Sequence, residues 1–294
     1  MSKKVVVFGG SGFLGSYVCD ELTRRGYHVV IADLNPSIYS QVNQKFIKAD
    51  ILSIASIKEA IIDADIVYNF AAVADLEDAI YKPLDTININ VLGNLNLLEV
   101  CKEQNIDRFI YASSAYALSE EGSFYGISKQ SSEKLTEEYY KRYGLKYTVI
   151  RYGSLYGERP SHNNYIYNLL KNSIQTGKIE YKGDGEDVRE YIHAADAAKL
   201  SVDILEDIQY ENEHLILTGL EKLKRIELIT MINEIMKNSL EITQIEEENF
   251  GHYKITPYSF YPNVAKKLVA NPYIDLGQGL LECIQEIHKE IDSE

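Results

Sequence analysis

The stretch Val5 to Gly15, which reads VVVFGGSGFLG, decides the fold. Its β-branched and aromatic residues predict a buried strand, and a helix is expected from Phe13 to Leu22. Between the two lie Gly9, Gly12 and Gly15, at spacings of three. In a phosphate-binding turn the first glycine takes the tight turn, the second lets backbone amides approach a pyrophosphate, and the third brings the helix close to the strand. The alternative is an ordinary glycine-rich turn.

An acidic residue follows at the end of the next apolar run, YHVVIAD, where Asp33 stands eighteen positions after Gly15. A carboxylate there can accept hydrogen bonds from the ribose hydroxyls of NAD, and it repels the 2′-phosphate of NADP. Leu34 and Asn35 come next, so no arginine is present to hold that phosphate. The turn, the spacing and the acid together predict NAD as the cofactor. Alone, Asp33 is equally a solvated strand end.

The composition limits the class of protein. The chain has 294 residues, of which 45% are hydrophobic, and a net charge of −14. This acidity argues against a nucleic acid partner and against an anionic membrane surface, although backbone amides can still bind a phosphorylated ligand. Cys19, Cys101 and Cys283 form no CxxC pair, so we expect reduced thiols and no metal site. With no apolar run as long as a membrane span, a cytoplasmic protein is expected.

Strands and helices alternate along the first half of the chain. Further strands are expected at Lys45 to Ala49, Ala64 to Ala74, Arg108 to Ala112 and Tyr147 to Arg151, with helices at Ser53 to Ile61, at Leu84 to Gln104 and between the last two strands. Such alternation predicts an α/β fold with a Rossmann-type, doubly wound parallel sheet and helices on both faces.

The second half is less regular. Its expected elements are helices at Tyr165 to Thr176, His193 to Glu206, Lys222 to Lys237 and Gly277 to Ile291, and strands near Ile179, near Val188 and at His214 to Leu217. We expect an NAD-binding domain over residues 1–157 and a smaller C-terminal substrate-binding lobe mainly over 158–294. Segments near 193–217 are expected to return to the first domain.

Other strand ends also fit a bound dinucleotide. Asp50 and Ile51 follow the third strand and can hold an adenine through its amino group and its face, although Asp50 can equally begin the turn before the next helix. The small residues that end the run ADIVYNFAAVA let a cofactor lie across the strand end, as packing against a helix would also require. Asn90 interrupts a helix with a polar side chain, which we expect to hold a neighbouring loop or strand.

The chemistry is expected at Tyr125 and Lys129, which are four residues apart on one helix. The lysine ammonium, together with an oxidised nicotinamide, favours the phenolate of Tyr125 and so lets it act as a base near neutral pH. Tyr125 can then remove the proton of a substrate alcohol while hydride leaves the same carbon. Ser114, at the end of the preceding strand, can polarise the same oxygen. Taken singly, a Tyr and a Lys four apart on a helix are more often surface or packing residues, and a Ser that ends a strand is commonplace.

As a set, these motifs resemble an extended short-chain dehydrogenase/reductase of the NAD-dependent epimerase/dehydratase family, which acts on nucleotide sugars, and more closely a UDP-glucose 4-epimerase-like protein. The resemblance covers nearly the whole chain. It rests on GGSGFLG (Gly9 to Gly15), Asp33, Asp50 and Ile51, NFAA (Asn69 to Ala72), NVLG (Asn90 to Gly93), SSAY (Ser113 to Tyr116), YGISK (Tyr125 to Lys129), RYGSLYG (Arg151 to Gly157) and REYIH (Arg189 to His193).

The resemblance implies further site residues. Those implied to line the cofactor, beyond the glycines and acids above, are Phe13, Leu14, Leu34, Phe70, Ala71, Ala72, Asn90, Tyr125, Lys129 and Tyr152. Those implied to bind the substrate are Ser114, Tyr125, Ser154 and Arg189, of which Arg189 meets the diphosphate. An arginine suits that role because its planar fork holds phosphate oxygens at two points. Its alternative partners are Glu186 and Asp187, and His193, which opens a helix, is expected to be structural.

Departures from the family pattern bear on the reaction. Ala115 and Tyr116 stand where sugar 4,6-dehydratases of the family carry an Asp-Glu pair, so dehydration is disfavoured. Ser154 replaces a frequent Asn, and Ala74 stands where some family epimerases have a Lys. The leading hypothesis is an epimerase that transiently oxidises a nucleotide-sugar hydroxyl, at C4.

Two other functions stay open. The first is a 4-dehydrogenase or ketoreductase with net turnover of the cofactor, which uses the same acid/base set and differs in product release. The second is a noncatalytic NAD-binding scaffold, since folds of this kind are reused in that way. The resemblance further implies a homodimer, formed by the helices at Leu84 to Gln104 and Ser128 to Arg142 as a four-helix bundle.

Overall fold

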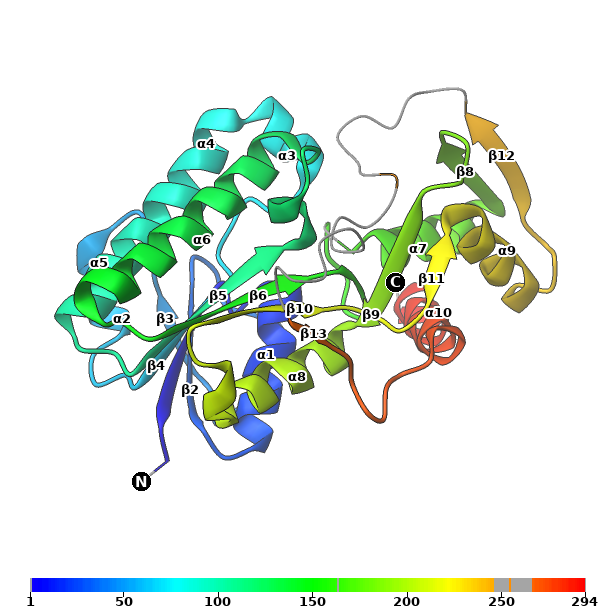
Figure 1. Cartoon of the computed structure of the whole chain (residues 1–294). Coiled ribbons are helices and arrows are strands. Elements are labelled where there is room, and N and C mark those ends of the chain that lie inside the picture. The colour runs from blue at the N-terminus through cyan, green and yellow to red at the C-terminus, as the bar shows by residue number, and fades with distance from the viewer. Residues whose placement is uncertain (1, 163, 246–253, 255–265, 294) are drawn as a thin grey trace.

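A parallel sheet of eight strands forms the centre of the computed structural model, which describes residues 2–162, 164–245, 254 and 266–293 (Figure 1). The strand order is β13-β10-β6-β5-β4-β1-β2-β3, and every neighbouring pair is parallel. The strands are β1 (Lys4–Phe8), β2 (His28–Asp33), β3 (Lys45–Lys48), β4 (Ile66–Asn69), β5 (Arg108–Ser114), β6 (Tyr147–Tyr152), β10 (Glu213–Leu217) and β13 (Lys266–Leu268). The order reverses between β1 and β4, where ligands of doubly wound sheets bind.

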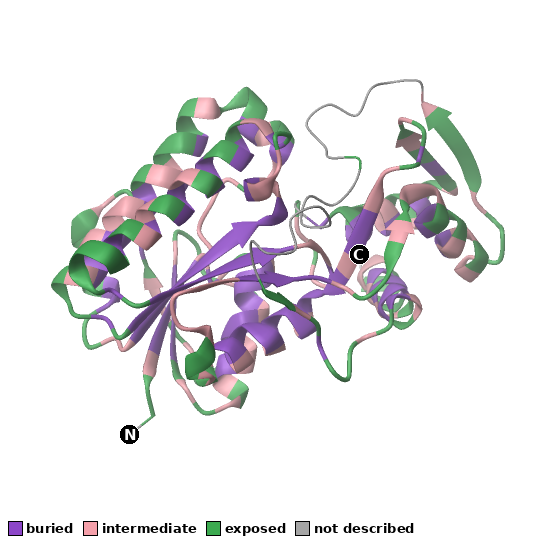
Figure 2. Cartoon of the chain, in the orientation of Figure 1, coloured by how far each residue is buried: buried purple, intermediate pink, exposed green. Residues whose placement is uncertain are grey.

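Both faces of the sheet are buried, which explains why its strands read as continuous apolar runs. Val5 and Val7 of β1 face one layer, formed by α1 (Phe13–Arg24) and α8 (Ala194–Glu206). Val6 and Phe8 face the other, formed by α2 (Ile54–Ala60), α5 (Asn94–Glu103) and α6 (Ser123–Tyr143). The central strands are accordingly buried while the outer helix faces are exposed (Figure 2). The predicted α/β fold and doubly wound sheet are confirmed.

The segment after β4 differs from the sequence expectation. A short helix, α3 (Leu76–Tyr81), is present where none was predicted, and the expected helix from Leu84 to Gln104 consists of α4 (Pro83–Ile87), a π-helical turn (Asn88–Gly93) and α5. Asp75 caps α3, because its carboxylate accepts the amide of Asp78 at 3.0 Å. This cap and the acids in the first turn were available in the sequence as a helix-start signal.

The remaining elements pack as a smaller lobe beside the carboxyl end of the sheet (Figure 1). It contains α7 (Tyr165–Thr176), α9 (Arg225–Ile235) and α10 (Leu276–Ser293), with the paired strands β8 (Lys178–Lys182) and β12 (Glu241–Ile245). A three-stranded sheet of β7 (Ser154–Tyr156), β9 (Val188–His193) and β11 (Lys222–Lys224) joins the lobe to the rest.

The expected helix from Lys222 to Lys237 is shorter than predicted, because its first residues pair antiparallel with β9 as β11. Strand β10 returns to the large sheet beside β6. Among the described residues, none of the helices combines the length and the apolar content that crossing a membrane requires.

Candidate active site

A cavity of about 1000 Å³ lies at the carboxyl ends of the central strands and extends to the lobe. Nearly all the residues expected to bind cofactor or substrate line this one cavity, although they come from most of the length of the chain. They are Gly9, Gly12, Phe13, Leu14, Gly15, Asp33, Leu34, Asp50, Ile51, Phe70, Ala71, Ala72, Ser114, Tyr125, Lys129, Tyr152, Ser154 and Arg189. Asn90 is the exception.

The glycine turn between β1 and α1 is shaped to receive an anion. Gly9 has φ +73, and a Cβ there would lie 2.6 Å from the backbone nitrogen of Ala71. A Cβ on Gly15 would lie 2.2 Å from the carbonyl oxygen of Gly9, so both positions require glycine. Gly12 caps α1 without a side-chain hydrogen bond, and the first turn carries no acid. The amides of that turn therefore have no protein acceptor within the helix and face the cavity.

Asp33 is held rigidly at the tip of β2. Its Oδ2 accepts the amide of Ser11 at 3.0 Å, and its Oδ1 accepts the amide of Leu34 at 2.7 Å. The amide of Asn35 also donates to Oδ1, at 3.5 Å, so Oδ2 is the oxygen that keeps a lone pair for a ribose hydroxyl. Asp50 combines the two interpretations left open by the sequence: its Oδ1 accepts the amide of Leu52 at 2.8 Å and so begins a turn, and the residue also lines the cavity.

Asn90 supports the cavity wall and does not line the cavity. Its Oδ1 accepts the amide of Val73 at 2.8 Å, and its Nδ2 donates to the carbonyl of Val73 at 3.0 Å and to Oγ of Ser128 at 2.9 Å. The side chain is buried, and these bonds use its donors and its acceptor. Asn90 thus ties the loop after β4 to α6. The supporting role that the sequence predicted is therefore present, while the contact of Asn90 with the cofactor stays a prediction.

The three residues expected to carry the chemistry meet at one end of β5. Ser114 ends that strand, while Tyr125 and Lys129 face it from α6. The Nζ of Lys129 donates to the carbonyl of Ala112 at 2.8 Å and lies 5.7 Å from the ring centroid of Tyr125. Burial lowers the pKa of Lys129 to about 8, against a smaller opposing effect of the Glu133 carboxylate. The ammonium is therefore held close to the phenol by the strand end.

Helix α3, which sequence reasoning missed, packs directly against the candidate base. Leu76 and Ala79 contact Tyr125 in a small apolar cluster that also includes Tyr116. The rings of Tyr116 and Tyr125 are 6.1 Å apart in an edge-to-face arrangement. These contacts fix the ring of Tyr125 at the cavity wall, so α3 contributes to the site through positioning.

A buried ion pair fixes α6 to the sheet behind these residues. Glu133 accepts from Nε and Nη2 of Arg151 at 2.9 and 2.7 Å, and from Oγ of Ser113 at 2.5 Å. Glu133 lies four residues after Lys129, so both are on the helix face that looks toward β5 and β6. Because the pair connects α6 to both strands, it sets the position of Tyr125 and Lys129 relative to Ser114.

The lobe contributes a cationic wall opposite the strand ends. Arg189 on β9 and Arg225 at the start of α9 both line the cavity, and both reach Asp187, at 3.4 and 2.8 Å. The ion pair of Arg189 with Asp187 that the sequence left open is therefore present, while the guanidinium still faces the cavity. Arg225 was not singled out from the sequence, because only the fold brings α9 to this wall.

His193 caps α8 and behaves as a structural residue. Its Nδ1 accepts the amide of Ala195 at 3.2 Å, which leaves the ring proton on Nε2. Nε2 faces Oε1 of Glu158 at 3.3 Å. Although His193, Glu158 and Glu282 lie within reach of one another, this tautomer makes the imidazole a hydrogen-bond donor, which disfavours metal ligation.

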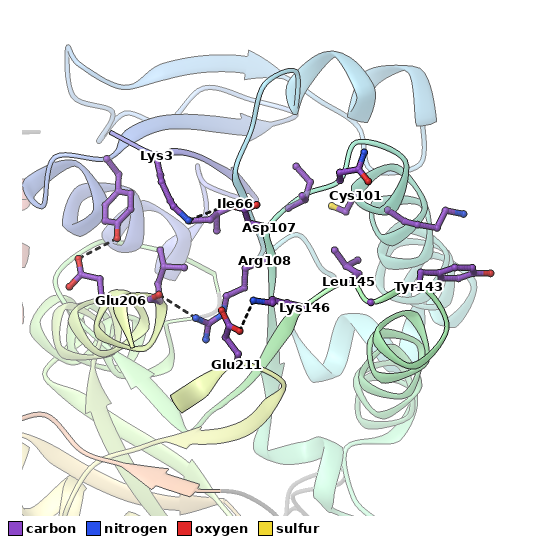
Figure 3. Close-up of a pocket in the computed structure, with 16 residues that line it drawn as sticks. Lys3, Ile66, Cys101, Asp107, Arg108, Tyr143, Leu145, Lys146, Glu206 and Glu211 are labelled. Atoms are coloured by element: carbon purple, nitrogen blue, oxygen red, sulfur yellow. Dashed lines mark hydrogen bonds and ion pairs between the residues drawn. The ribbon is translucent and has the colours of Figure 1, made fainter. Parts of the chain in front are cut away.

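A second cavity, of about 710 Å³, lies at the opposite, amino end of the sheet (Figure 3). Its charged side chains pair with one another, as Lys3 does with Asp107 at 3.2 Å and Lys146 with Glu211 at 2.9 Å. Arg108 donates to the carbonyls that end α8. Because ligands of open α/β sheets bind at the carboxyl ends of the strands, the cavity beside the glycine turn is the candidate active site.

Comparison with known proteins agrees with this fold. A model of the NAD dependent epimerase/dehydratase family matches residues 5–217. The chain is 31% identical over 224 residues to a putative UDP-glucose 4-epimerase of Methanocaldococcus jannaschii, which covers 67% of this chain and 72% of that protein. It is 26% identical to the UDP-N-acetyl-alpha-D-glucosaminuronate decarboxylase of Bacillus cytotoxicus, over 97% of this chain and 98% of that one.

Among solved structures, the UDP-glucuronic acid 4-epimerase of Bacillus cereus, in complex with UDP-glucuronic acid and NAD, superposes with a TM-score of 0.85 at 24% identity, over 98% of this chain and 99% of that one. At this identity the likeness concerns the fold alone. The chain belongs to the NAD dependent epimerase/dehydratase family. NAD is the cofactor of that family, as the glycine turn and Asp33 predict.

Proposed function

We propose that this protein is an NAD-dependent epimerase that inverts a hydroxyl-bearing carbon, at C4, of a nucleotide-linked sugar. The observation that carries the proposal is the convergence of Ser114, Tyr125 and Lys129 in one cavity, between the glycine turn and the two arginines of the lobe. The turn suits a dinucleotide, and Arg189 and Arg225 suit a diphosphate. The reacting hydroxyl then lies between them, beside Tyr125.

The residues present fit NAD. Gly9 and Gly15, where a Cβ would collide with backbone, permit the tight turn and the close approach of α1 to β1. Gly12 keeps the uncapped start of α1 free of a side chain beside a pyrophosphate, and the carboxylate of Asp33 is fixed at the tip of β2 for a ribose. Phe70 and Tyr152 line the cavity between the turn and the catalytic residues. NAD, when bound, supplies the reversible two-electron acceptor that this chemistry requires.

The side chains of this protein handle the proton. Tyr125 takes the proton of the sugar hydroxyl as its carbon is oxidised and returns it as the carbon is reduced. Ser114 donates a hydrogen bond to the same oxygen, and the ammonium of Lys129 stabilises the phenolate form of Tyr125. Inversion follows when the keto sugar rotates in the cavity and is then reduced on its other face. Ala115 and Tyr116 offer no carboxylate for loss of water, which supports epimerisation over dehydration.

Two alternatives use the same cavity. A 4-dehydrogenase or ketoreductase differs only in releasing the keto sugar, and a noncatalytic NAD-binding scaffold would not turn over any sugar. The names of the relatives favour the epimerase over both alternatives, since several are UDP-sugar 4-epimerases. They also favour UDP as the nucleotide.

Analysis of products tests the proposal. The NAD-loaded protein is incubated with a panel of nucleotide sugars, and products are followed by mass spectrometry and NMR. An isomer of unchanged mass, inverted at C4, supports the epimerase. A product that lacks two hydrogens and forms together with NADH contradicts the epimerase and supports the dehydrogenase. Absence of turnover on the whole panel contradicts both enzymatic proposals.

We also propose that the protein is a cytoplasmic homodimer. In support of this assembly, the helices expected to pair across it expose apolar side chains, with Leu84 at 78%, Leu92 at 46% and Ile127 at 56% exposure. The three cysteines are free and buried, as in a reducing compartment. Light scattering tests the dimer: wild-type mass should be twice that of the chain, and Leu92→Glu should shift it toward the monomer.

A further inference from the structure

The two ends of the substrate half of the cavity carry opposite charge. The lobe wall includes Arg189 and Arg225, which both pair with Asp187. The wall beside the catalytic residues, at the start of α3, includes Asp75 and Glu77. A nucleotide sugar bound with its diphosphate at the arginines therefore directs its sugar toward acidic groups.

The acidic end is close to the reacting position. Leu76, between the two acids, belongs to the same small apolar cluster as Tyr125. Lys129 is 4% exposed and its Nζ is bound to the carbonyl of Ala112, so it is not positioned to neutralise a group at the α3 wall. Arg189 and Arg225 belong to the opposite, lobe wall.

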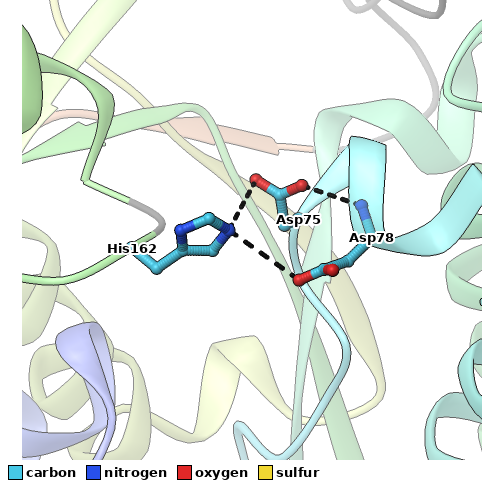
Figure 4. Close-up of side chains that lie close together, drawn as sticks. All are labelled: Asp75, Asp78 and His162. Carbon is cyan, nitrogen blue, oxygen red and sulfur yellow. Dashed lines mark hydrogen bonds and ion pairs between the residues drawn. The ribbon is translucent and has the colours of Figure 1, made fainter. Parts of the chain in front are cut away.

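One imidazole faces this wall and does not reverse its charge. His162, from the segment before α7, lies with Nε2 3.8 Å from Oδ2 of Asp75 and 3.8 Å from Oδ2 of Asp78 (Figure 4). Lys82 pairs with Asp78 at 3.1 Å, so even with a protonated imidazole the three carboxylates of Asp75, Glu77 and Asp78 exceed the two cations by one charge. Asp75 also accepts the first-turn amide of Asp78, which removes a donor that would otherwise attract an anion.

We propose that Asp75 and Glu77 make the site selective for nucleotide-linked sugars without a carboxylate and against nucleotide-linked uronates. The inference rests on the proposed function and adds the class of sugar. A uronate carboxylate would be brought into a partly dehydrated cavity beside like charges, where Coulomb repulsion is stronger than in water. Selectivity of this kind comes from a repulsive element against the wrong ligand. The fold does not decide it, since a protein of the same fold was solved with UDP-glucuronic acid.

Binding to the NAD-loaded protein tests the inference. Dissociation constants for UDP, UDP-glucose and UDP-glucuronate are measured by calorimetry, with a chelator present so that no stray cation bridges the carboxylates. We expect UDP-glucuronate to bind at least about tenfold more weakly than UDP-glucose, a ratio that corresponds to about 1.4 kcal/mol. UDP-glucose and UDP-glucuronate share the same diphosphate, so the ratio of their dissociation constants reports the contribution of the sugar carboxylate.

Neutral variants identify the cause. Asp75→Asn keeps an oxygen for the amide of Asp78. The double variant Asp75→Asn, Glu77→Gln should reduce the ratio of the two dissociation constants, UDP-glucuronate over UDP-glucose, at least about threefold. Glu59→Gln removes the same charge from an exposed position on α2 that does not line the cavity, and it should leave the ratio unchanged. Raising the salt concentration should also narrow the wild-type ratio, because Asp75 is partly exposed, and this measurement does not depend on the folding of a variant.

The outcomes separate the two proposals. If UDP binds and the ratio is near one, or if the ratio survives in the double variant, the inference is overturned and the proposed function stands. If UDP does not bind at all, the assignment of a UDP-sugar site fails first. The inference is supported if UDP binds, if UDP-glucuronate binds about tenfold more weakly than UDP-glucose, and if the double variant reduces that ratio at least about threefold while Glu59→Gln does not.

Discussion

Replacing Glu133 by Gln breaks the buried ion pair that ties α6 to the sheet. The side chains of Glu133 and Arg151 are 3% and 5% exposed and share two hydrogen bonds, and Ser113 donates to the same carboxylate. The substitution keeps the shape of residue 133 but leaves the guanidinium without a counter-charge and turns an NH₂ group toward it or toward Ser113. Because both side chains are buried, bulk water cannot solvate this charge without opening the interface.

The expected cost follows from this burial. Removing one partner of a buried, hydrogen-bonded pair typically costs about 3–5 kcal/mol, so we expect a loss of about 3 kcal/mol or more in the free energy of unfolding. A matched control lies on the same helix: Glu138 pairs with Arg142, and these side chains are 49% and 72% exposed. Glu138→Gln should cost about 0–1 kcal/mol.

Urea unfolding followed by far-ultraviolet circular dichroism measures both variants, and since the chain has 23 tyrosines and no tryptophan, tyrosine emission provides the second probe. Coincident transitions are needed for a single free energy of unfolding. A cost for Glu133→Gln below about 1 kcal/mol, or equal to that of Glu138→Gln, would contradict the claim that this pair holds the catalytic helix in place.

Three further predictions concern the cofactor end of the site. Gly15→Ala places a carbon 2.2 Å from the Gly9 oxygen, against 3.2 Å for Gly12→Ala, so the free energy of unfolding measured in urea should fall more for Gly15→Ala, and the reverse order would refute the geometry of the turn. Asp33→Asn removes the charge that repels a 2′-phosphate, so the preference for NAD over NADP should shrink, and an unchanged ratio of dissociation constants would contradict the role of Asp33. Burial lowers the pKa of Lys129 from 10.5 to about 8. Between these pH values the unfolded chain binds a proton that the folded chain lacks, so the free energy of unfolding of the wild type rises by about 3 kcal/mol as the pH rises from 8 to 10.5. Lys129→Met lacks that gain, so its stability relative to wild type should be highest below pH 8 and fall toward pH 10.5, whereas a constant difference would contradict the burial of the charge.

The parts of the site that are local in sequence were predictable. The tight turn at Gly9, the close approach at Gly15 and the acid at Asp33 each follow from one strand end and the residues beside it. The i, i+4 pair of Tyr125 and Lys129 likewise needs only the helix that carries it. The alternating strands and helices then bring these pieces to one edge of a parallel sheet, so the fold class and the cavity follow together.

The parts that depend on contacts distant in sequence were not predictable. Arg225 reaches the cavity because β11 pairs with β9 and sets the start of α9 beside Asp187. The expected helix over Lys222 to Lys237 missed that pairing, since strand partners do not appear in a single segment. Asn90 was correctly expected to hold a loop, but its place behind the cavity depends on the packing of α6.

Helix α3 illustrates a different limit. The start signal at Asp75 was present in the sequence, yet the helix has six residues and its apolar positions are too few for a clear period. Its importance comes from the tertiary contact of Leu76 with Tyr125, which places Asp75 and Glu77 at the sugar end of the cavity. The specificity of the site therefore had no signal in the motifs that identified the family.

Turnover by Tyr125→Phe tests the central claim, that Tyr125 transfers the proton in a C4 oxidation and reduction. The matched control is Tyr143→Phe, at the exposed end of the same helix and outside the cavity. With the nucleotide sugar that wild type converts fastest, NMR should show a rate reduced by about 10² or more for Tyr125→Phe, with NAD still bound, and no loss for Tyr143→Phe. Conversion by Tyr125→Phe at the wild-type rate would contradict the account.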